Sequence, residues 1–276
     1  MNKLLKASGM MPFLFQLSCD AMNMLKSIYI RLIIFKSIIQ YQLRHILKTF
    51  TLKGIKLSID EDKVLSKTVL LSVLQGGYED KENKLIKENL ESNDVVLELG
   101  AGIGFNSITA AKINGGKIIS YESNPYLHPV IKKNQALNNV SFEVREKILL
   151  STRSPVKTIP FKIADNICMS SIKDYVQEGY SVNEVKQVET EFLGDVLASL
   201  SPAFLIVDIE GGEEDLFNAP EVLQHSSVKK ILVEVHLEII GKNACATVIS
   251  NISKAGFDLV SESPDRTVLF FTKSKS

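Results

Sequence analysis

The chain has 276 residues, of which 45% are hydrophobic, and this composition is typical of a globular protein with room for one large domain. Its 32 basic and 32 acidic side chains balance, but residues 1–59 hold nine of the basic ones and a single acid, Asp20. The remaining residues are therefore net acidic, with 23 basic and 31 acidic side chains. An acidic main body argues against a nucleic-acid substrate, which binds best to a basic face.

The N-terminal part differs in character from the rest of the chain. Residues 1–20 predict a loose tail, because their apolar stretch is short and no signal-peptide cleavage site follows it. Residues 21–62 predict a basic amphipathic helical segment, with apolar residues at three- and four-residue steps and lysines and arginines between them. Such a helix can pack on the rest of the chain or on a second copy of it. It can also lie on an anionic membrane surface through residues 21–50.

Residues 63–276 predict one α/β domain, because strand-like and helix-like runs alternate along them. The approach to the first strand is helical, with one helix near residues 81–91. The predicted strands are 95–99, 117–121, 140–144, 204–208, 230–235, 257–262 and 267–272, and the later helices are 104–113, 126–137, 190–200, 213–224 and 242–255. A turn at residues 263–266 joins the last two strands, which should form an antiparallel hairpin.

A glycine-rich turn follows the first of these strands and is the most informative motif. Glu98 lies near the end of the strand, and Gly100, Gly102 and Gly104 follow it in the pattern E-x-G-x-G-x-G. Phe105 occupies the position where a dinucleotide fingerprint has its third glycine. The spacing therefore favours S-adenosylmethionine (SAM) over a nicotinamide cofactor. Together with the predicted strands and helices, this motif predicts a seven-stranded, mostly parallel Rossmann-like methyltransferase sheet with a terminal antiparallel hairpin and an N-terminal helical segment.

Two acidic side chains are placed to hold parts of this cofactor. Glu122 lies 22 residues after Gly100, just past the second predicted strand, where its carboxylate could accept both ribose hydroxyls. Glu98 would accept hydrogen bonds from the methionine ammonium, directly or through water. The glycine turn, including Ala101, would align the methyl donor.

A long connection separates the third and fourth predicted strands. Between Val144 and Phe204 lie 59 residues, well beyond an ordinary crossover. We expect this insertion, residues 145–203, to contain short strands near 160–164 and 184–188 and to cover the acceptor side.

Two further strand ends are rich in ionisable residues. Asp208, Glu210 and Glu213 follow one buried strand, and Glu234 and His236 follow the next. Adjacent parallel strands would bring these side chains together at the carboxyl edge of the sheet. Such a cluster could supply a general base or a site for a hard divalent cation. Alternatively, the acids cap a helix and the histidine is satisfied locally, and no metal ligand is assigned from the sequence.

The ordered set of motifs over residues 70–272 resembles the FkbM-like methyltransferases. The departures are Glu98 for the more usual aspartate, Gly102 for the more usual asparagine, and a missing alanine near residues 146–148. Residues 1–60 lie outside the resemblance. The matching segments are Gly77–Glu79, Glu98–Gly104, Tyr121–Pro125, Met169–Ile172, Asp208–Glu213 and Glu234–His236.

The resemblance implies a SAM-dependent O-methyltransferase that acts on a hydroxyl of a sugar, a glycan or a secondary metabolite, with no nucleic-acid partner. The predicted catalytic residues are Asp208, Glu210 and His236. The predicted cofactor-binding residues are Tyr78, Glu79, Glu98, Gly100, Ala101, Gly102, Gly104, Glu122 and Ser123.

Two other classes of function stay open at this point. One is a SAM-binding or membrane-associated scaffold protein without catalysis, and the other is an NAD(P)-dependent oxidoreductase. Cys19, Cys168 and Cys245 show no C-x-x-C spacing, which excludes a disulfide scaffold and a thiolate zinc site of the usual spacing. We therefore expect a cytoplasmic protein, either free or peripheral at the inner face of the membrane.

Overall fold

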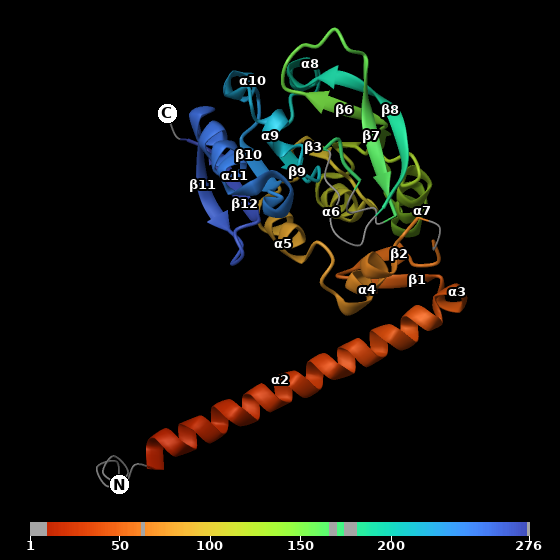
Figure 1. The fold of residues 1–276 in the computed structure, drawn as a ribbon, viewed down its shortest axis with the longest axis vertical. Coiled ribbons are helices and arrows are strands. Elements are labelled where there is room, and N and C mark those ends of the chain that lie inside the picture. The colour runs from red at the N-terminus through yellow and green to blue at the C-terminus, as the bar shows by residue number, and fades with distance from the viewer. Residues whose placement is uncertain (1–9, 62–63, 166–169, 174–180, 275–276) are drawn as a thin grey trace.

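A seven-stranded sheet forms the centre of the molecule (Figure 1). The computed structural model describes residues 10–61, 64–165, 170–173 and 181–274, with side chains from residue 23 onward. The strand order is β11-β12-β10-β9-β3-β4-β5, in which only β12 runs antiparallel to its neighbours. The strands are β3 (Val96–Leu99), β4 (Ile118–Tyr121), β5 (Glu143–Arg145), β9 (Phe204–Val207), β10 (Lys230–Glu234), β11 (Phe257–Glu262) and β12 (Val268–Lys273). The predicted mostly parallel α/β fold with a terminal hairpin is confirmed.

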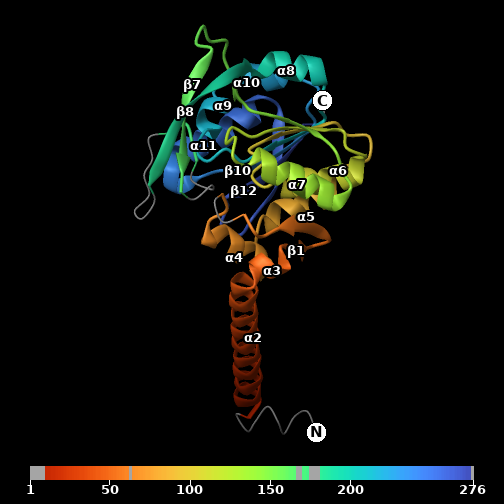
Figure 2. The same cartoon turned by 90° about the vertical axis from the view of Figure 1, so that its right-hand side faces the viewer.

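Helices cover both faces of this sheet and give the molecule three layers (Figure 2). All residues of β3 and β9 are buried, which is expected for parallel strands with helices on each side. One apolar core lies under α4 (Lys67–Gln75), α5 (Asp80–Asn89), α6 (Phe105–Asn114) and α7 (His128–Asn138). The other lies under α8 (Leu193–Leu200), α9 (Glu213–Leu216), α10 (Pro220–Gln224) and α11 (Leu237–Lys254).

Three predicted helices have different bounds in the structure. The helix expected at 213–224 is two short helices, α9 and α10, because Pro220 disfavours helical backbone at the residue before it. The helix expected from 190 begins at Leu193, since the preceding strand continues to Phe192. Helix α11 begins at Leu237, but the non-helical Gly241 divides it, and its second part begins at residue 242 as expected.

The insertion forms a second sheet of three strands. The strands expected at 160–164 and 184–188 are present as β7 (Thr158–Ala164) and β8 (Val182–Phe192). An additional strand, β6 (Lys147–Leu150), pairs in parallel with β8, and β7 pairs with β8 in the antiparallel sense. This sheet stands over the carboxyl edge of the central sheet (Figure 1).

The N-terminal segment is only partly as expected. Residues 10–20 belong to helix α2 (Met10–Gln42), so the expectation of a loose tail is wrong for them, and residues 1–9 lie outside the described residues. After α3 (Arg44–Leu47), the chain forms a hairpin of β1 (Thr49–Leu52) and β2 (Ile55–Ser58) in place of continued helix. The hairpin forms because its inward side chains reach the core and Gly54 supplies left-handed backbone at the turn.

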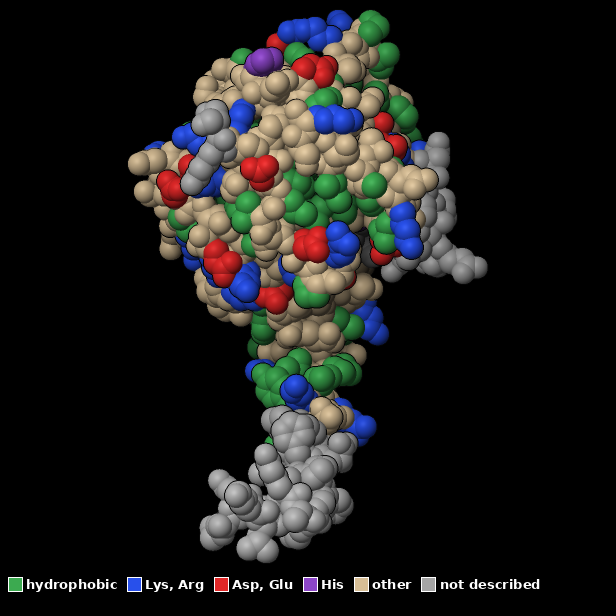
Figure 3. Space-filling model, turned by 90° about the vertical axis from the view of Figure 1, so that its left-hand side faces the viewer, with side chains coloured by type: hydrophobic (Ala, Val, Ile, Leu, Met, Phe, Trp, Pro, Cys, Tyr) green, Lys and Arg blue, Asp and Glu red, His purple; other side chains and the backbone are tan. Residues whose placement is uncertain are grey.

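Helix α2 extends away from the rest of the molecule (Figures 1 and 2). It packs on α4 only near its C-terminal end, where Ser37 is buried. Apolar, lysine and arginine side chains are exposed along its described part (Figure 3). Among the described residues, none of the helices combines the length and the apolar content needed to cross a bilayer.

Candidate functional site

A cavity of about 240 Å³ opens at the carboxyl edge of β3, β4 and β9. The residues that follow these strands line it: Gly100 after β3, Glu122 after β4, and Asp208 after β9. Ligands of open α/β sheets bind at this edge, so the cavity lies where the sequence predicts the cofactor.

The glycine turn is held against the end of β4 by backbone hydrogen bonds. The Gly100 amide donates to the carbonyl oxygen of Tyr121 at 2.8 Å, and the Ala101 amide donates to the same oxygen at 3.2 Å. Gly100, Gly102 and Gly104 all have positive φ, the conformation that glycine adopts without strain. The turn therefore presents backbone to the cavity with no side chain in the way.

The carboxylate of Glu122 fixes this turn and also faces the cavity. Its Oε2 accepts a hydrogen bond from the Gly102 amide at 2.8 Å, and its Oε1 accepts one from the Asn124 amide at 2.8 Å. Each carboxylate oxygen can accept a further hydrogen bond, so the two oxygens remain able to take the two hydroxyls of a ribose. This placement agrees with the role predicted for Glu122.

Glu98 does not line the cavity. Its side chain is 2% exposed and accepts hydrogen bonds from the hydroxyls of Ser107 in α6 and Ser120 in β4. Glu98 points to the face of β3 opposite Leu97 and Leu99, away from the cavity, and its contact with the methionine ammonium stays a prediction. The carboxylate links the end of β3 to α6 and β4.

Two more of the predicted residues, Tyr78 and Glu79, fold over the glycine turn and line the cavity. A Cβ at Gly102 would lie 3.1 Å from the Tyr78 hydroxyl and 3.7 Å from Glu79 Oε1. Burial raises the pKa of the Glu79 carboxyl well above its usual range. Ser123 also lines the cavity, whereas Ala101 and Gly104 do not. Gly104 directly precedes α6 and packs against Ile131 of α7.

Binding of SAM should strengthen as pH rises through about 7. Burial raises the pKa of Glu122 to about 7, and the ionised form is the one that accepts hydrogen bonds from a ribose. With the Glu122 carboxyl as the controlling group, the affinity for SAM should increase roughly tenfold between pH 6 and pH 8. Below pH 7, binding of SAM should release a proton from this carboxyl. Calorimetry in two buffers of different ionisation enthalpy measures both quantities. A Glu122→Gln variant should lose the pH dependence, and an unchanged dependence in that variant would assign it to another group.

Several cavity residues were not among the predicted site residues, and most of them come from the insertion. Phe161, Ser170 and Ile172 line the cavity together with residues 147–152, and Asn218 does so from the segment after α9. Ser170 and Ile172 belong to the matching segment Met169–Ile172, whereas no motif marks Phe161, Asn218 or residues 147–152.

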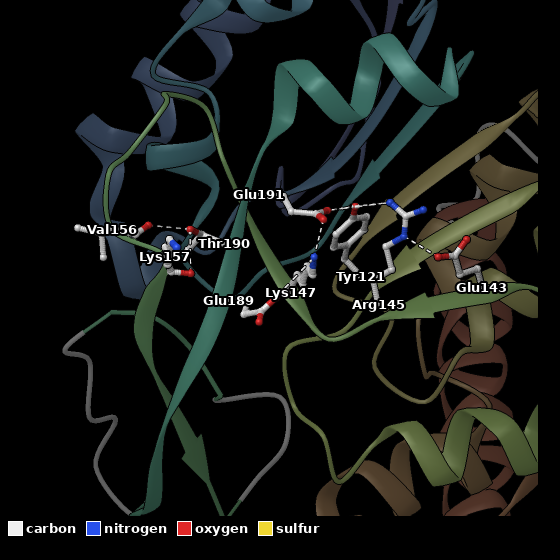
Figure 4. Close-up of polar contacts among 9 residues, drawn as sticks. All are labelled: Tyr121, Glu143, Arg145, Lys147, Val156, Lys157, Glu189, Thr190 and Glu191. Atoms are coloured by element: carbon white, nitrogen blue, oxygen red, sulfur yellow. Dashed lines mark hydrogen bonds and ion pairs between the residues drawn. The ribbon is translucent and has the colours of Figure 1, made fainter.

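A polar network holds the added sheet to the edge of the central one (Figure 4). Glu191 of β8 accepts hydrogen bonds from the Tyr121 hydroxyl at 2.7 Å and from Lys147 Nζ at 2.6 Å. Arg145 donates to the same tyrosine oxygen at 2.9 Å and to Glu143 at 2.7 Å. Because Tyr121 and Lys147 also line the cavity, the network fixes the insertion beside the cofactor site.

The acids after β9 and β10 meet as predicted. Asp208 and Glu210 line the cavity, and the Nε2 atom of His236 lies 3.5 Å from Asp208 Oδ1 and 3.3 Å from Glu210 Oε2. The Nδ1 atom of His236 lies 3.0 Å from Glu213 Oε1, whose side chain is 0% exposed. Oε1 of Glu213 also accepts hydrogen bonds from the Ile209 and Gly211 amides at 3.2 Å.

The cluster is strongly perturbed electrostatically. Burial raises the pKa of Glu210 and of Glu234 to about 8, and it raises the pKa of Asp208 well above its usual range. Burial on its own would lower the pKa of His236, but the hydrogen bond to Glu213 and the charges of Glu210 and Asp208 raise it to about 11. Ionisable groups with strongly shifted pKa values are common at functional sites.

Comparisons with known proteins give the chemistry of this cavity. The family model of the TRM5/TYW2 methyltransferase domain matches residues 52–188, just under half of the chain. A Methanocaldococcus jannaschii protein named as a protein N5-glutamine methyltransferase is 40% identical over 75 residues, which are 26% of this chain and 38% of the relative. The family match spans the glycine turn, Glu122 and the loop of Tyr78 and Glu79.

This chain contains a SAM-dependent methyltransferase domain. The predicted enzyme class and cofactor are therefore confirmed, and the oxidoreductase and non-catalytic alternatives are not supported. The braced glycine turn and the Glu122 carboxylate of this methyltransferase fit the nucleoside of the cofactor. Glu79 and Tyr78 are the polar side chains nearest to the turn on its other side.

Solved structures share the fold at low similarity. A precorrin-6Y C5,15-methyltransferase of Geobacter metallireducens has a TM-score of 0.43 at 15% identity, covering 79% of this methyltransferase and 97% of that chain. A tRNA m1G37 methyltransferase of M. jannaschii has a TM-score of 0.42 at 14% identity, covering 83% and 57%. At these values neither structure identifies the substrate of the methyltransferase described here.

Three expectations from the sequence are corrected by these comparisons. The resemblance to the FkbM-like family is not the one the chain shows, because the matching family model is that of the TRM5/TYW2 domain. The hydroxyl acceptor of a glycan or small molecule was implied by that resemblance and is withdrawn with it. The exclusion of a nucleic-acid partner is overturned by the same match. A net charge summed over residues 60–276 does not show where the basic side chains lie.

Proposed function

We propose that this methyltransferase transfers its methyl group to RNA. The observation that carries the proposal is the match to the TRM5/TYW2 methyltransferase domain, which includes the residues that build the cofactor cavity. One of the solved structures of low similarity is that of a tRNA methyltransferase. The relative named for protein glutamine methylation favours a second candidate, a protein side-chain amide.

The N-terminal part supplies the positive charge that RNA requires. We call residues 23–58, from the described part of α2 to the end of β2, the basic arm. It has no acidic residue, and its apolar side chains are largely exposed along α2. Phosphate contacts by such cations account for most of the sequence-independent affinity of nucleic-acid-binding proteins. The exposed cations of the arm are Lys26, Arg31, Lys36, Lys48, Lys53 and Lys56.

The side chains at the cavity divide into two groups by their chemistry. The glycine turn and Glu122 hold the cofactor, which supplies a methyl group activated by a sulfonium. Asp208 and Glu210 line the cavity beyond Gly100, where their carboxylates can accept an N–H or O–H of the acceptor and take up its proton. Phe161 of the added sheet and Ser123 also line the cavity, and the sheet would exclude water from that side.

Methyl transfer from tritiated SAM tests the proposal. The enzyme is incubated with total RNA and, separately, with total protein from cells that lack it. The label should appear in the RNA fraction and should be released by ribonuclease but not by protease. Label in the protein fraction alone would replace this proposal with the second candidate. No label in either fraction would contradict both.

Charge reversal on the basic arm gives a control that does not touch the cavity. The triple variant Lys26→Glu, Arg31→Glu and Lys36→Glu should weaken RNA binding and lower the slope of log K against log salt by about 2. Its affinity for SAM should match that of the wild type. The matched control reverses three exposed lysines of the main body, Lys117, Lys132 and Lys229, and should leave RNA binding nearly unchanged. Equal effects of the two triple variants would show that the arm is not the binding surface.

A further inference from the structure

The cluster behind the cavity has the donor set of a metal centre. Asp208 and Glu234 each offer a carboxylate oxygen and His236 offers an imidazole nitrogen, and these three atoms lie within 4.8 Å of one another. The three residues come from the carboxyl ends of two paired strands, β9 and β10, so the sheet itself fixes their spacing. Mixed carboxylate and imidazole ligands suit first-row divalent metals such as Mn²⁺ and Zn²⁺.

The histidine is oriented as a metal ligand by its second nitrogen. The Nδ1 atom of His236 lies 3.0 Å from Oε1 of the buried Glu213, which sets the ring so that Nε2 points to Asp208 and Glu210. Ligating histidines commonly bind a carboxylate through the nitrogen that does not hold the metal. Glu213 is itself held by the Ile209 and Gly211 amides, so this orientation is rigid.

Two buried oxygens of the cluster have no hydrogen-bond partner among the described residues. They are Oδ1 of Asp208, which faces His236 Nε2, and Oε2 of Glu213, whose side chain is 0% exposed. A buried acceptor without a hydrogen bond is costly, and a bound metal ion can satisfy such an oxygen.

The charge of the cluster is also unbalanced. Within the described part of the chain, the ion pairs of Asp208, Glu210 and Glu213 are all made with His236. His236 is thus the cation that Asp208, Glu210 and Glu213 share in the described part of the chain. Buried charges of one sign persist when they are paired or when they coordinate a metal.

We propose that Asp208, Glu234 and His236 bind one divalent first-row transition-metal ion, with Glu213 as the residue that positions His236. The site adjoins the cofactor cavity through Asp208, and three protein ligands leave coordination positions open to water or to the methyl acceptor. The metal site does not depend on the acceptor being RNA, because its ligands are all side chains of this chain.

Binding of Mn²⁺ to the full-length protein, stripped beforehand with a chelator, tests the site. Electron paramagnetic resonance should show one Mn²⁺ bound per chain, and pulsed measurements should show one directly coordinated ¹⁴N from the imidazole. Glu234→Gln and His236→Gln should each weaken Mn²⁺ binding at least tenfold, and the second should abolish the ¹⁴N signal. Glu213→Gln should leave the nitrogen coordinated but weaken binding about 10- to 100-fold, as loss of a ligand-orienting carboxylate does.

Glu238→Gln is the matched control, because Glu238 is an acid on α11 near the cluster that supplies none of the three ligand atoms. It should bind Mn²⁺ like the wild type. Circular dichroism shows whether each variant is folded. If His236→Gln unfolds, Glu234→Gln still tests the site, because it preserves the size of the side chain. Absence of Mn²⁺ binding by the folded wild type would overturn the proposal and leave His236 as the cation of the cluster. Binding without a ¹⁴N signal, or equal binding by all variants, would overturn it as well.

Discussion

Gly100→Ala should abolish SAM binding and destabilise the protein by about 3–5 kcal/mol. Gly100 has a φ of +84°, and a Cβ there would lie 1.5 Å from the backbone carbonyl oxygen of Asp208. A backbone atom cannot move aside as the tip of a flexible side chain can, so β3 and β9 would have to separate. That movement would open the cofactor cavity at the point where the two strands meet it.

Thermal unfolding and calorimetry with SAM measure the two effects. At roughly 2–4 °C per kcal/mol, the melting temperature should fall by about 10 °C. Gly77→Ala is the matched control, because Gly77 precedes the cavity residue Tyr78, has an ordinary φ, and a Cβ there would be 4.0 Å from its nearest neighbour. A Gly100→Ala protein with wild-type stability and affinity would mean that the strand ends are not packed as described.

Glu122→Ala should weaken SAM binding by about 1.5–3 kcal/mol, or roughly 10- to 150-fold. The substitution removes the acceptor of the Gly102 and Asn124 amides, so the glycine turn loses its brace. It also removes the carboxylate to which the ribose hydroxyls would donate. Both losses act on the same ligand and should appear together in its dissociation constant.

Calorimetry with SAM and with S-adenosylhomocysteine should show the same loss, since both carry the ribose. Glu143→Ala is the control, because Glu143 is an exposed acid on the neighbouring strand β5 whose ion pair with Arg145 is worth at most about 1 kcal/mol. Wild-type affinity in a folded Glu122→Ala protein would remove Glu122 from the cofactor site.

The central sheet could be read from the sequence because its strands are short apolar runs bounded by turn residues. Phe204–Val207 and Val96–Leu99 are apolar enough to require cover on both faces, which predicts parallel strands between helices. Glu122 and Asp208 could be placed at one edge for the same reason, since parallel strands end together. The break before α10 could also be predicted locally, because Pro220 disfavours helical backbone at the residue before it.

The sequence was a poorer guide to the face of the sheet on which a strand-end side chain lies. Glu98 was expected in the cavity, but alternation along β3 places it on the α6 face, where two serines satisfy it. The hairpin of β1 and β2 lies in the segment 21–62, for which the sequence predicts helix. Its inward side chains are apolar because they close the core beside α7, a contact that local periodicity does not contain.

The sequence by itself determined the fold class and the methyl donor, and it predicted Gly100, Gly102 and Glu122 as cofactor-binding residues, which line the cavity. Glycine spacing and strand order make this possible because they reflect the geometry of a nucleoside site. Only the tertiary structure decided which insertion residues reach the cavity and how His236 is held between Glu213 and Asp208. The physical reason is that these contacts join segments far apart in the chain. Strand pairing and burial bring them together, and no local pattern of residues encodes the distance between them.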